Sequence, residues 1–416
     1  MTFASADPLF SNGVHVTLAI LIIVLVKVLV GFAVIMGAVT LMIWFERKAI
    51  SDMQSRIGPQ RWGPFGLLQT LADGIKLFAK EDLMPAEADR FVFKLAPYLV
   101  LVPALITFSV IPLGGTVTVA GHVIQLQIAN PPMGILVMLA MSGISVYGIM
   151  LAGWASGSKY PLLSSVRASA QMISYEAALG MTIVTVALIS GSLSTHDIVN
   201  SQGGGIWHWN LIRLGFVPFI VFVIAITAEL GRPPFDVVEA ESELVGGFHT
   251  EYSSIRFALF FMAEFMNTLT MSALIVTLFL GGPAGYVPNI SHLRWVFPIL
   301  WFLAKTTAFA FSYIWFRAAL PRFRYDQVME LGWKRLIPLS LGWMLIVAGF
   351  LVKPADGFAM AAVVILAWTL LSRAFELGAD RASGVGALMP IVGERPVPGE
   401  VIRAVSDAMD DEDEGE

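Results

Sequence analysis

The chain has 416 residues, of which 56% are hydrophobic and only 14% are charged. Soluble domains carry about 25% charged residues, so this composition excludes an ordinary soluble protein and predicts a polytopic membrane protein. Seven acids in the C-terminal stretch DAMDDEDEGE account for the formal net charge of −5, and we expect this tail to be solvated. Because cysteine is absent, this chain alone builds no disulfide and no cysteine-ligated iron–sulfur cluster.

Several kinds of chemistry have no motif in this sequence. Glycine-rich phosphate loops, nucleophile–base arrangements and basic patches with stacking aromatics are missing, which argues against nucleotide or nucleic-acid binding. The histidines show no metal-ligand spacing, so we interpret them as solvated or interfacial side chains and predict no metal site. They are His15, His122, His196, His208, His249 and His292.

Apolar runs of transmembrane length follow one another along the chain. A bilayer core requires about 20 apolar residues per helix. We predict an all-α polytopic membrane protein with eight core transmembrane helices and a shorter ninth, near 17–44, 91–112, 133–153, 169–192, 211–229, 257–282, 294–316, 336–352 and 358–372. The predicted organisation is an outer segment at 1–16, a membrane core at 17–352, an extra helix at 353–376 and a cytoplasmic acidic tail at 377–416.

Lysine and arginine are distributed unevenly between the connections. Seven of them lie between the first two predicted spans, whereas 113–132 and 193–210 contain none. Because basic residues remain on the cytoplasmic side, we predict an outer N-terminus, long charged cytoplasmic loops and, for a bacterial protein, the cytoplasmic membrane.

The first connection contains an amphipathic segment, GLLQTLADGIKLFAKED. Its apolar face, formed by Leu67, Leu68, Leu71, Ile75 and Phe78, predicts an interfacial helix that is too polar to span the bilayer. Such a helix either frames an opening at membrane depth or merely packs beside the bundle, and periodicity alone favours the second.

Three carboxylates, Glu176, Glu229 and Glu264, fall in or at the ends of predicted spans. An ionisable group in hydrocarbon costs several kcal/mol, so such groups pair, face a protein interior or line water. The structural alternative is ion pairing, for example Glu264–Lys305 or Glu176–Arg167. We favour a proton relay, because carboxyl groups without nearby cations tend to retain protons.

The stretch AELGRPPFDVVEAESELVGGFHTEY adds an acidic cluster next to these carboxylates. Asp236, Glu239 and Glu243 recur at helical spacing, so they share one face and each one's charge affects its neighbours' proton affinity. Their alternative role is to complement a helix N-terminus. Gly246 and Gly247 follow directly and provide hinge-like backbone freedom.

Four motifs in order resemble the H subunit of proton-pumping NADH:quinone oxidoreductase (respiratory complex I), the family that includes mitochondrial NADH dehydrogenase subunit 1. They are ERKAISDMQSRIGPQRWGPFGLLQTLADGIKLFAKED at 46–82, GWASGSKYPLLSSVRASAQMISYE at 153–176, GRPPFDVVEAESELVGGFHTEYSSIRFALFFMAEF at 231–265 and LPRFRYDQVMELGWK at 320–334. The chain departs from the family at Leu230-Gly231, where Thr-Asn is usual.

The resemblance implies a membrane subunit that forms a quinone access tunnel and couples quinone reduction to proton translocation through an acidic path. It implies the quinone-tunnel residues Glu46, Arg47, Arg56, Asp73, Lys76 and Arg232. It implies the proton-path residues Glu176, Glu229, Asp236, Glu239, Glu241, Glu243, Glu251 and Glu264, with Arg167 as a charge partner.

The resemblance further implies ubiquinone or menaquinone as the substrate, with FMN and iron–sulfur clusters confined to partner subunits. These partners are the quinone-site and terminal-cluster subunits of the hydrophilic arm and adjacent small membrane subunits. The rival interpretations are a membrane subunit of an energy-converting hydrogenase, a self-contained ion transporter and an inert scaffold. The first lacks a quinone partner, and the second predicts transport by this chain alone.

Overall fold

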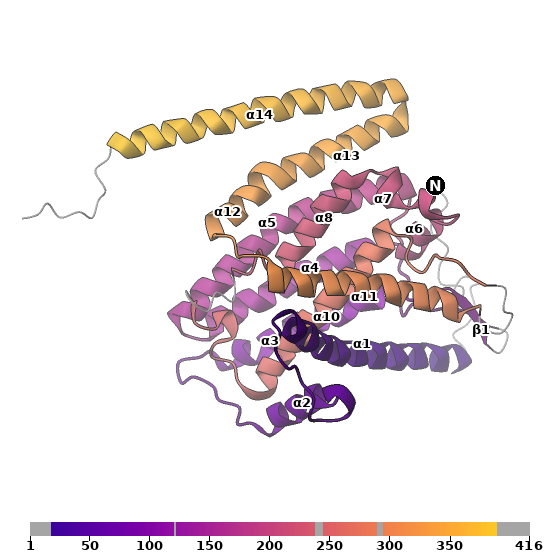
Figure 1. Ribbon diagram of the computed structural model, residues 1–416, viewed down its shortest axis with the longest axis vertical. Helices are drawn as coiled ribbons and strands as arrows, with labels where there is room; N and C mark the ends of the chain where they lie inside the picture. Colours follow the sequence, from indigo (N-terminus) through magenta and orange to yellow (C-terminus); the bar gives the residue numbers. More distant parts are fainter. Residues whose placement is uncertain (1–17, 120–121, 238–243, 289–293, 389–416) are drawn as a thin grey trace, which may run out of the picture. The chain divides into compact units, whose positions relative to one another are not determined.

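The computed structural model describes residues 18–119, 122–237, 244–288 and 294–388, which are predominantly helical (Figure 1). The long helices are α1 (Leu18–Met53), α3 (Arg90–Ser109), α4 (Gly134–Ala155), α5 (Lys159–Ser190), α8 (Phe216–Glu229), α10 (Ser254–Phe279), α11 (Val296–Ala319), α13 (Ile337–Val352) and α14 (Pro354–Leu388). The shorter elements are η1 (Pro64–Gly66), α2 (Gln69–Ala79), β1 (Thr116–Val119), β2 (His122–Gln125), α6 (Thr195–Ser201), η2 (Ile206–His208), α7 (Asn210–Arg213), η3 (Gly247–His249), α12 (Tyr325–Glu330) and the π-helical turn η4 (Leu331–Leu336).

Eight helices among the described residues are long and apolar enough to cross a membrane, which confirms the predicted all-α polytopic class. The predicted fifth span corresponds to α8, which has only 14 residues and extends for about 21 Å. It is therefore too short to cross a full hydrocarbon core alone. The chain forms two compact units, Met1–Ala361 and Ala362–Glu416, and all residues discussed below belong to the first.

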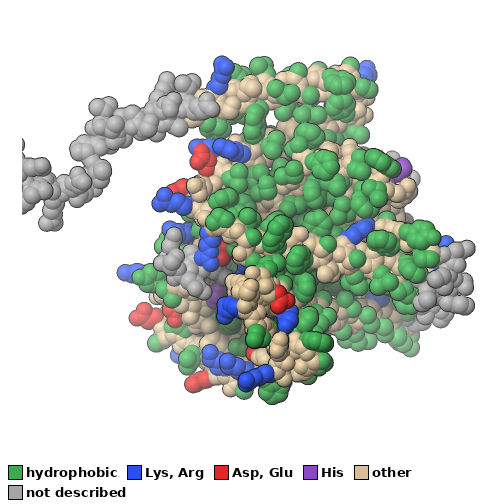
Figure 2. Space-filling model, viewed as in Figure 1, with side chains coloured by type: hydrophobic (Ala, Val, Ile, Leu, Met, Phe, Trp, Pro, Cys, Tyr) green, Lys and Arg blue, Asp and Glu red, His purple; other side chains and the backbone are tan. Residues whose placement is uncertain are grey.

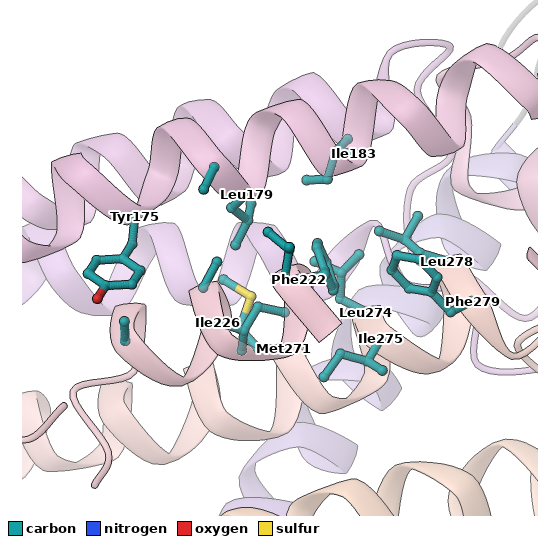
Figure 3. Packing of buried hydrophobic residues seen from close by; sticks show 14 of the residues in the cluster. Tyr175, Leu179, Ile183, Phe222, Ile226, Met271, Leu274, Ile275, Leu278 and Phe279 are labelled. Atoms are coloured by element: carbon teal, nitrogen blue, oxygen red, sulfur yellow. The ribbon is translucent and has the colours of Figure 1, made fainter. Parts of the chain in front are cut away.

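The core between α5, α8 and α10 is closely packed. Figure 3 shows Leu179 and Ile183 of α5 and Phe222 of α8 meeting the α10 side chains Leu274 and Leu278. All five are at most 2% exposed. Burial of one such side chain contributes about 1.5–3 kcal/mol, so this core fixes the end of α8 relative to α5 and α10.

Small residues bring other helices together. An added Cβ on Gly153 of α4 would lie 2.1 Å from the hydroxyl oxygen of Ser165 on α5.

At the opposite end of α4, the connection from α3 contains the antiparallel strands β1 and β2, with Thr116 opposite Gln125. The two strands pair in antiparallel orientation along their four residues, an element that was not predicted from the sequence.

Helix α2 confirms the predicted amphipathic helix after the first span. Leu71, Ile75 and Phe78 are 57%, 63% and 75% exposed, so its apolar face is open. Ser254 donates hydrogen bonds to the carbonyl oxygens of Leu77 (3.0 Å) and Lys80 (2.8 Å) and ties the end of α2 to the start of α10. Figure 2 shows hydrophobic side chains over much of the visible face, with most of the charged ones at its left and lower margins.

Lys305 of α11 stabilises the turn after α10. Its ammonium donates to the carbonyl oxygens of Leu280 (2.8 Å), Gly282 (3.1 Å) and Ala284 (2.7 Å) and lies 4.6 Å from the centroid of the Trp209 ring. These oxygens follow a helix C-terminus, where a cation is favourable. The suggested pair between Glu264 and Lys305 is therefore wrong, because the ammonium is used at the opposite end of α10.

Replacing Lys305 with Met should destabilise the protein, because three carbonyl groups lose a charged donor. Hydrogen bonds to charged groups contribute about 1.5–3 kcal/mol. We expect a lower midpoint of thermal unfolding of the purified complex. Lys353→Met, at an exposed position, is the control and should leave the midpoint unchanged. Equal midpoints for the two variants would contradict the capping role.

Candidate functional site

The first cavity, called the α1 pocket, has a volume of about 480 Å³ and lies at the C-terminal end of α1. Its lining combines the polar Glu46, Arg47 and Arg56 with the aromatic rings of Phe261 and Phe265 on α10. Arg317 of α11 also contributes. Asp73 of α2 is not in the lining but forms an ion pair with Arg47. Arg232, described next, pairs with Glu46, so the structure brings five of the six predicted quinone-tunnel residues together, and only Lys76 lies apart.

A chain of alternating acids and bases leads inward from the α1 pocket. Arg317 donates a hydrogen bond to Glu46. Nη1 of Arg232 lies 3.0 and 3.1 Å from the two carboxylate oxygens of Glu46, and its Nη2 lies 3.1 Å from Oε1 of Glu264. Arg232 is 2% exposed and Glu46 is 4% exposed. Buried charges are tolerated only when they are paired. Each of these four side chains pairs with the next, so Arg317, Glu46, Arg232 and Glu264 form one continuous network of ion pairs.

The turn that ends α8 separates the side chains of Glu229 and Arg232, which are only three residues apart in the chain. Gly231 has φ 60°, the left-handed conformation that commonly terminates a helix, and Pro233 and Pro234 prevent its continuation. Glycine and asparagine adopt this conformation most readily, so Gly231 preserves the turn although the family usually has asparagine there. Glu229 consequently stays on α8, while Arg232 leaves it and meets Glu46.

The second cavity, called the α4–α10 cavity, has a volume of about 240 Å³. Its polar lining consists of the carboxyl-bearing Glu229 and Glu264, the imidazole of His249, and Thr107, Ser142, Ser145 and Asn267. Methionine and phenylalanine side chains form much of the remaining wall. Phe261 lines this cavity and the α1 pocket, and the Arg232–Glu264 ion pair connects them electrostatically. The two cavities are therefore neighbours.

Glu229 and Glu176 approach the same part of α4. Ser142 donates a hydrogen bond to Oε1 of Glu229, whose Oε2 is buried and has no hydrogen-bond partner among the described residues. An added Cβ on Gly143 would lie 3.4 Å from Oε1 of Glu176. The carboxyl groups of Glu229 and Glu176 therefore both lie against the stretch of α4 that contains Ser142 and Gly143.

Other predicted site residues lie outside the linings of both cavities. Lys76 is exposed on α2, and Glu251 is partly buried before α10. Asp236 forms an ion pair with Arg322, 3.0 Å between Oδ2 and Nη2. Glu239, Glu241 and Glu243 lie outside the described residues, so their place in the acidic path stays a prediction.

Two expectations about charge pairing are wrong. Glu176 and Arg167 are nine residues apart on α5, which separates them by about 13.5 Å along the helix axis. The guanidinium of Arg167 instead lies 5.6 Å from the ring centroid of Tyr325. Glu264, expected to lack a nearby cation, is paired with Arg232. That pairing was missed because Arg232 is distant in sequence.

Sequence reasoning also missed Arg317, Ser142 and His249. Arg317 lies in no motif that suggests a site, and an isolated serine in an apolar helix carries no pattern. His249 was interpreted as a solvated or interfacial side chain, but burial lowers its pKa, an effect that the nearby charge of Glu264 only partly opposes. Within the described segments no group of three or more His, Asp or Glu side chains could hold a metal ion.

The fold and these cavities define a class: a polytopic membrane protein in which ion-paired and hydrogen-bonded carboxyl groups line two neighbouring cavities. Residues 26–348 match the family model described as NADH dehydrogenase, and the chain belongs to that family.

Similar proteins carry a more specific name. The chain is 50% identical over 338 residues to the H subunit of NADH-quinone oxidoreductase from Frankia alni, covering 80% of this chain and 74% of the relative. It is 47% identical over 343 residues to an H subunit, numbered 2, of NADH-quinone oxidoreductase from Koribacter versatilis, covering 79% and 97%. Identity to the corresponding protein of Frankia casuarinae is 49% over 332 residues, covering 79% and 72%. The resemblance to this membrane component of a multi-subunit enzyme is thereby confirmed.

Proposed function

We propose that this chain forms part of the quinone access tunnel of an NADH:quinone oxidoreductase and couples quinone reduction to proton translocation. The observation that carries the proposal is the charge chain Arg317–Glu46–Arg232–Glu264, which connects a pocket of mixed aromatic and cationic lining to a cavity containing two carboxylates.

The α1 pocket suits a quinone head group. Phe261 and Phe265 offer apolar ring contacts, while Arg47 and Arg56 offer hydrogen-bond donors for carbonyl oxygens. Electrons would come from FMN and iron–sulfur clusters of partner subunits, since the sequence has no cysteine to hold a cluster. The quinone supplies the redox chemistry, and this chain binds it and responds to its change of charge.

The α4–α10 cavity suits the start of a proton path. Reduction of a quinone adds negative charge, which would change the balance between Glu46, Arg232 and Glu264. A change at Glu264 would then alter the proton affinity of Glu229 and, through it, that of Glu176. Glu239, Glu241, Glu243 and Glu251 would extend this acidic path, and Asp236 would anchor its loop.

The remaining assignments belong to the same proposal. The charged loops would face the cytoplasm of a bacterium, where the hydrophilic arm and small membrane subunits contact this chain. The chain would have no active site of its own. The test is NADH-driven quinone reduction with acidification of proteoliposomes containing the purified complex, compared with this chain alone. Proton transport by the isolated chain would favour a self-contained transporter, and a complex inactive with quinone would favour the hydrogenase type.

Replacing Arg56 with Ala should weaken quinone binding before it affects catalysis. A charged hydrogen bond contributes about 1.5–3 kcal/mol, so we expect KM for quinone to rise roughly tenfold or more with little change in kcat. Steady-state kinetics with a short-chain quinone measure this. Arg61→Ala, outside the pocket lining, is the control. Unchanged KM in Arg56→Ala would remove this residue from the site.

A further inference from the structure

His249 is a titratable side chain of the α4–α10 cavity that the proposed carboxylate path does not use. It is the last residue of the short helix η3, two positions after Gly247, which has φ 72°. The imidazole packs edge-on against Phe248 and Phe257, with ring centroids 5.1 and 5.3 Å apart. These contacts hold an ionisable ring in the wall of a cavity whose other ionisable lining groups are Glu229 and Glu264.

The charges around His249 favour exchange of a proton with a carboxylate. Glu264 acts on the imidazole electrostatically and is itself paired with Arg232. Helices α4 and α5 pack against η3. From them, Ser142, Ser145 and Met172 line the cavity, whereas Glu176 lies beside Gly143 and is not part of the lining. An imidazolium would therefore have Glu264 and Glu229 as its nearby acids in the described cavity wall.

We propose that His249 is a further proton-binding group of this cavity and exchanges its proton with the carboxyl group of Glu264. In the exchange a carboxyl O–H bond breaks and an imidazole N–H bond forms, leaving a carboxylate beside an imidazolium; the reverse step restores two neutral groups. Glu264 also binds Arg232, so the ion pair is stronger when Glu264 has given up this proton and weaker when Glu264 holds it. Arg232 in turn binds Glu46, so the protonation of Glu264 affects the electrostatics of the α1 pocket. The inference rests on the proposed function and adds to it a residue outside the acidic path.

Proton translocation per quinone reduced should be measured between pH 5 and 8 in the assembled complex. Burial lowers the pKa of His249, so wild type should show an ionisation on the acid side of the usual histidine range. His249→Asn and His249→Gln should lose that ionisation, whereas the exposed control His208→Asn should retain it. A wild-type pH profile in both His249 variants would overturn the inference.

A second measurement needs no His249 variant. Deuterium exchange at the imidazole C2 position, read by mass spectrometry of the peptide that contains His249, reports its protonation in the intact complex. Glu264→Gln removes a negative charge and should lower the pKa of His249 further. An unchanged exchange titration would overturn the inference even where Glu264→Gln abolishes pumping. Normal pumping in both Glu264→Gln and Glu229→Gln would instead overturn the proposed function.

Discussion

Replacement of Arg232 with Gln is expected to destabilise this chain more than any other single exchange considered. The guanidinium is buried between Glu46 and Glu264, with N–O distances of 3.0–3.1 Å. Removing one member of a buried charge network costs about 3–5 kcal/mol, because the remaining charges lose their compensation while staying out of water. We expect much less assembled complex on native gels and a lower thermal midpoint.

Two further variants separate charge from packing. Arg232→Gln combined with Glu264→Gln removes one cation and one anion, so it should recover part of the lost assembly. Lys334→Gln is the matched control, since its pair with Glu330 is exposed to solvent and such surface pairs contribute little to stability. If Arg232→Gln and Lys334→Gln assembled equally well, the buried network would not be a determinant of stability.

Replacement of Glu229 with Gln should abolish coupling and leave assembly intact. The amide oxygen of glutamine can still accept the hydrogen bond from Ser142, so the end of α8 retains its contact with α4. The amide cannot take up or release a proton in the physiological range. Positioned proton-transfer groups contribute about 10²–10⁴-fold to rates, and we expect at least roughly a hundredfold loss of proton translocation.

The measurement is acidification of proteoliposomes with quinone reduction recorded in parallel. Glu87→Gln, exposed in the connection between α2 and α3, is the control and should pump normally. Ser142→Ala keeps the carboxyl group but removes its donor, so an intermediate effect is expected. Full pumping by an assembled Glu229→Gln complex would mean that this carboxyl group takes no part in proton transfer. That result would support the interpretation of the chain as an inert scaffold.

The helical fold was predictable because a bilayer imposes strong rules on local sequence. A span requires about 20 apolar residues, and the sequence shows such runs at α1, α3 and α4. The chain must also satisfy its own backbone hydrogen bonds within the bilayer, so each run is expected to form a helix. The spacing of Leu71, Ile75 and Phe78 likewise predicted the amphipathic helix α2. The hairpin β1–β2 was missed because its two strands have only four residues each, too short for alternation of polar and apolar residues to stand out.

The sequence by itself determined that this is a membrane protein with carboxylates placed where lipid would penalise them, since composition and periodicity are local properties. Only the tertiary structure decided which charges meet. Arg232 pairs with Glu46, 186 positions earlier in the chain. Lys305, which the sequence offered only as one possible partner of Glu264, binds the carbonyl groups after α10. Ion pairs between helices require side chains to approach within a few ångströms, and those distances follow from helix packing, which a linear pattern of residues does not specify.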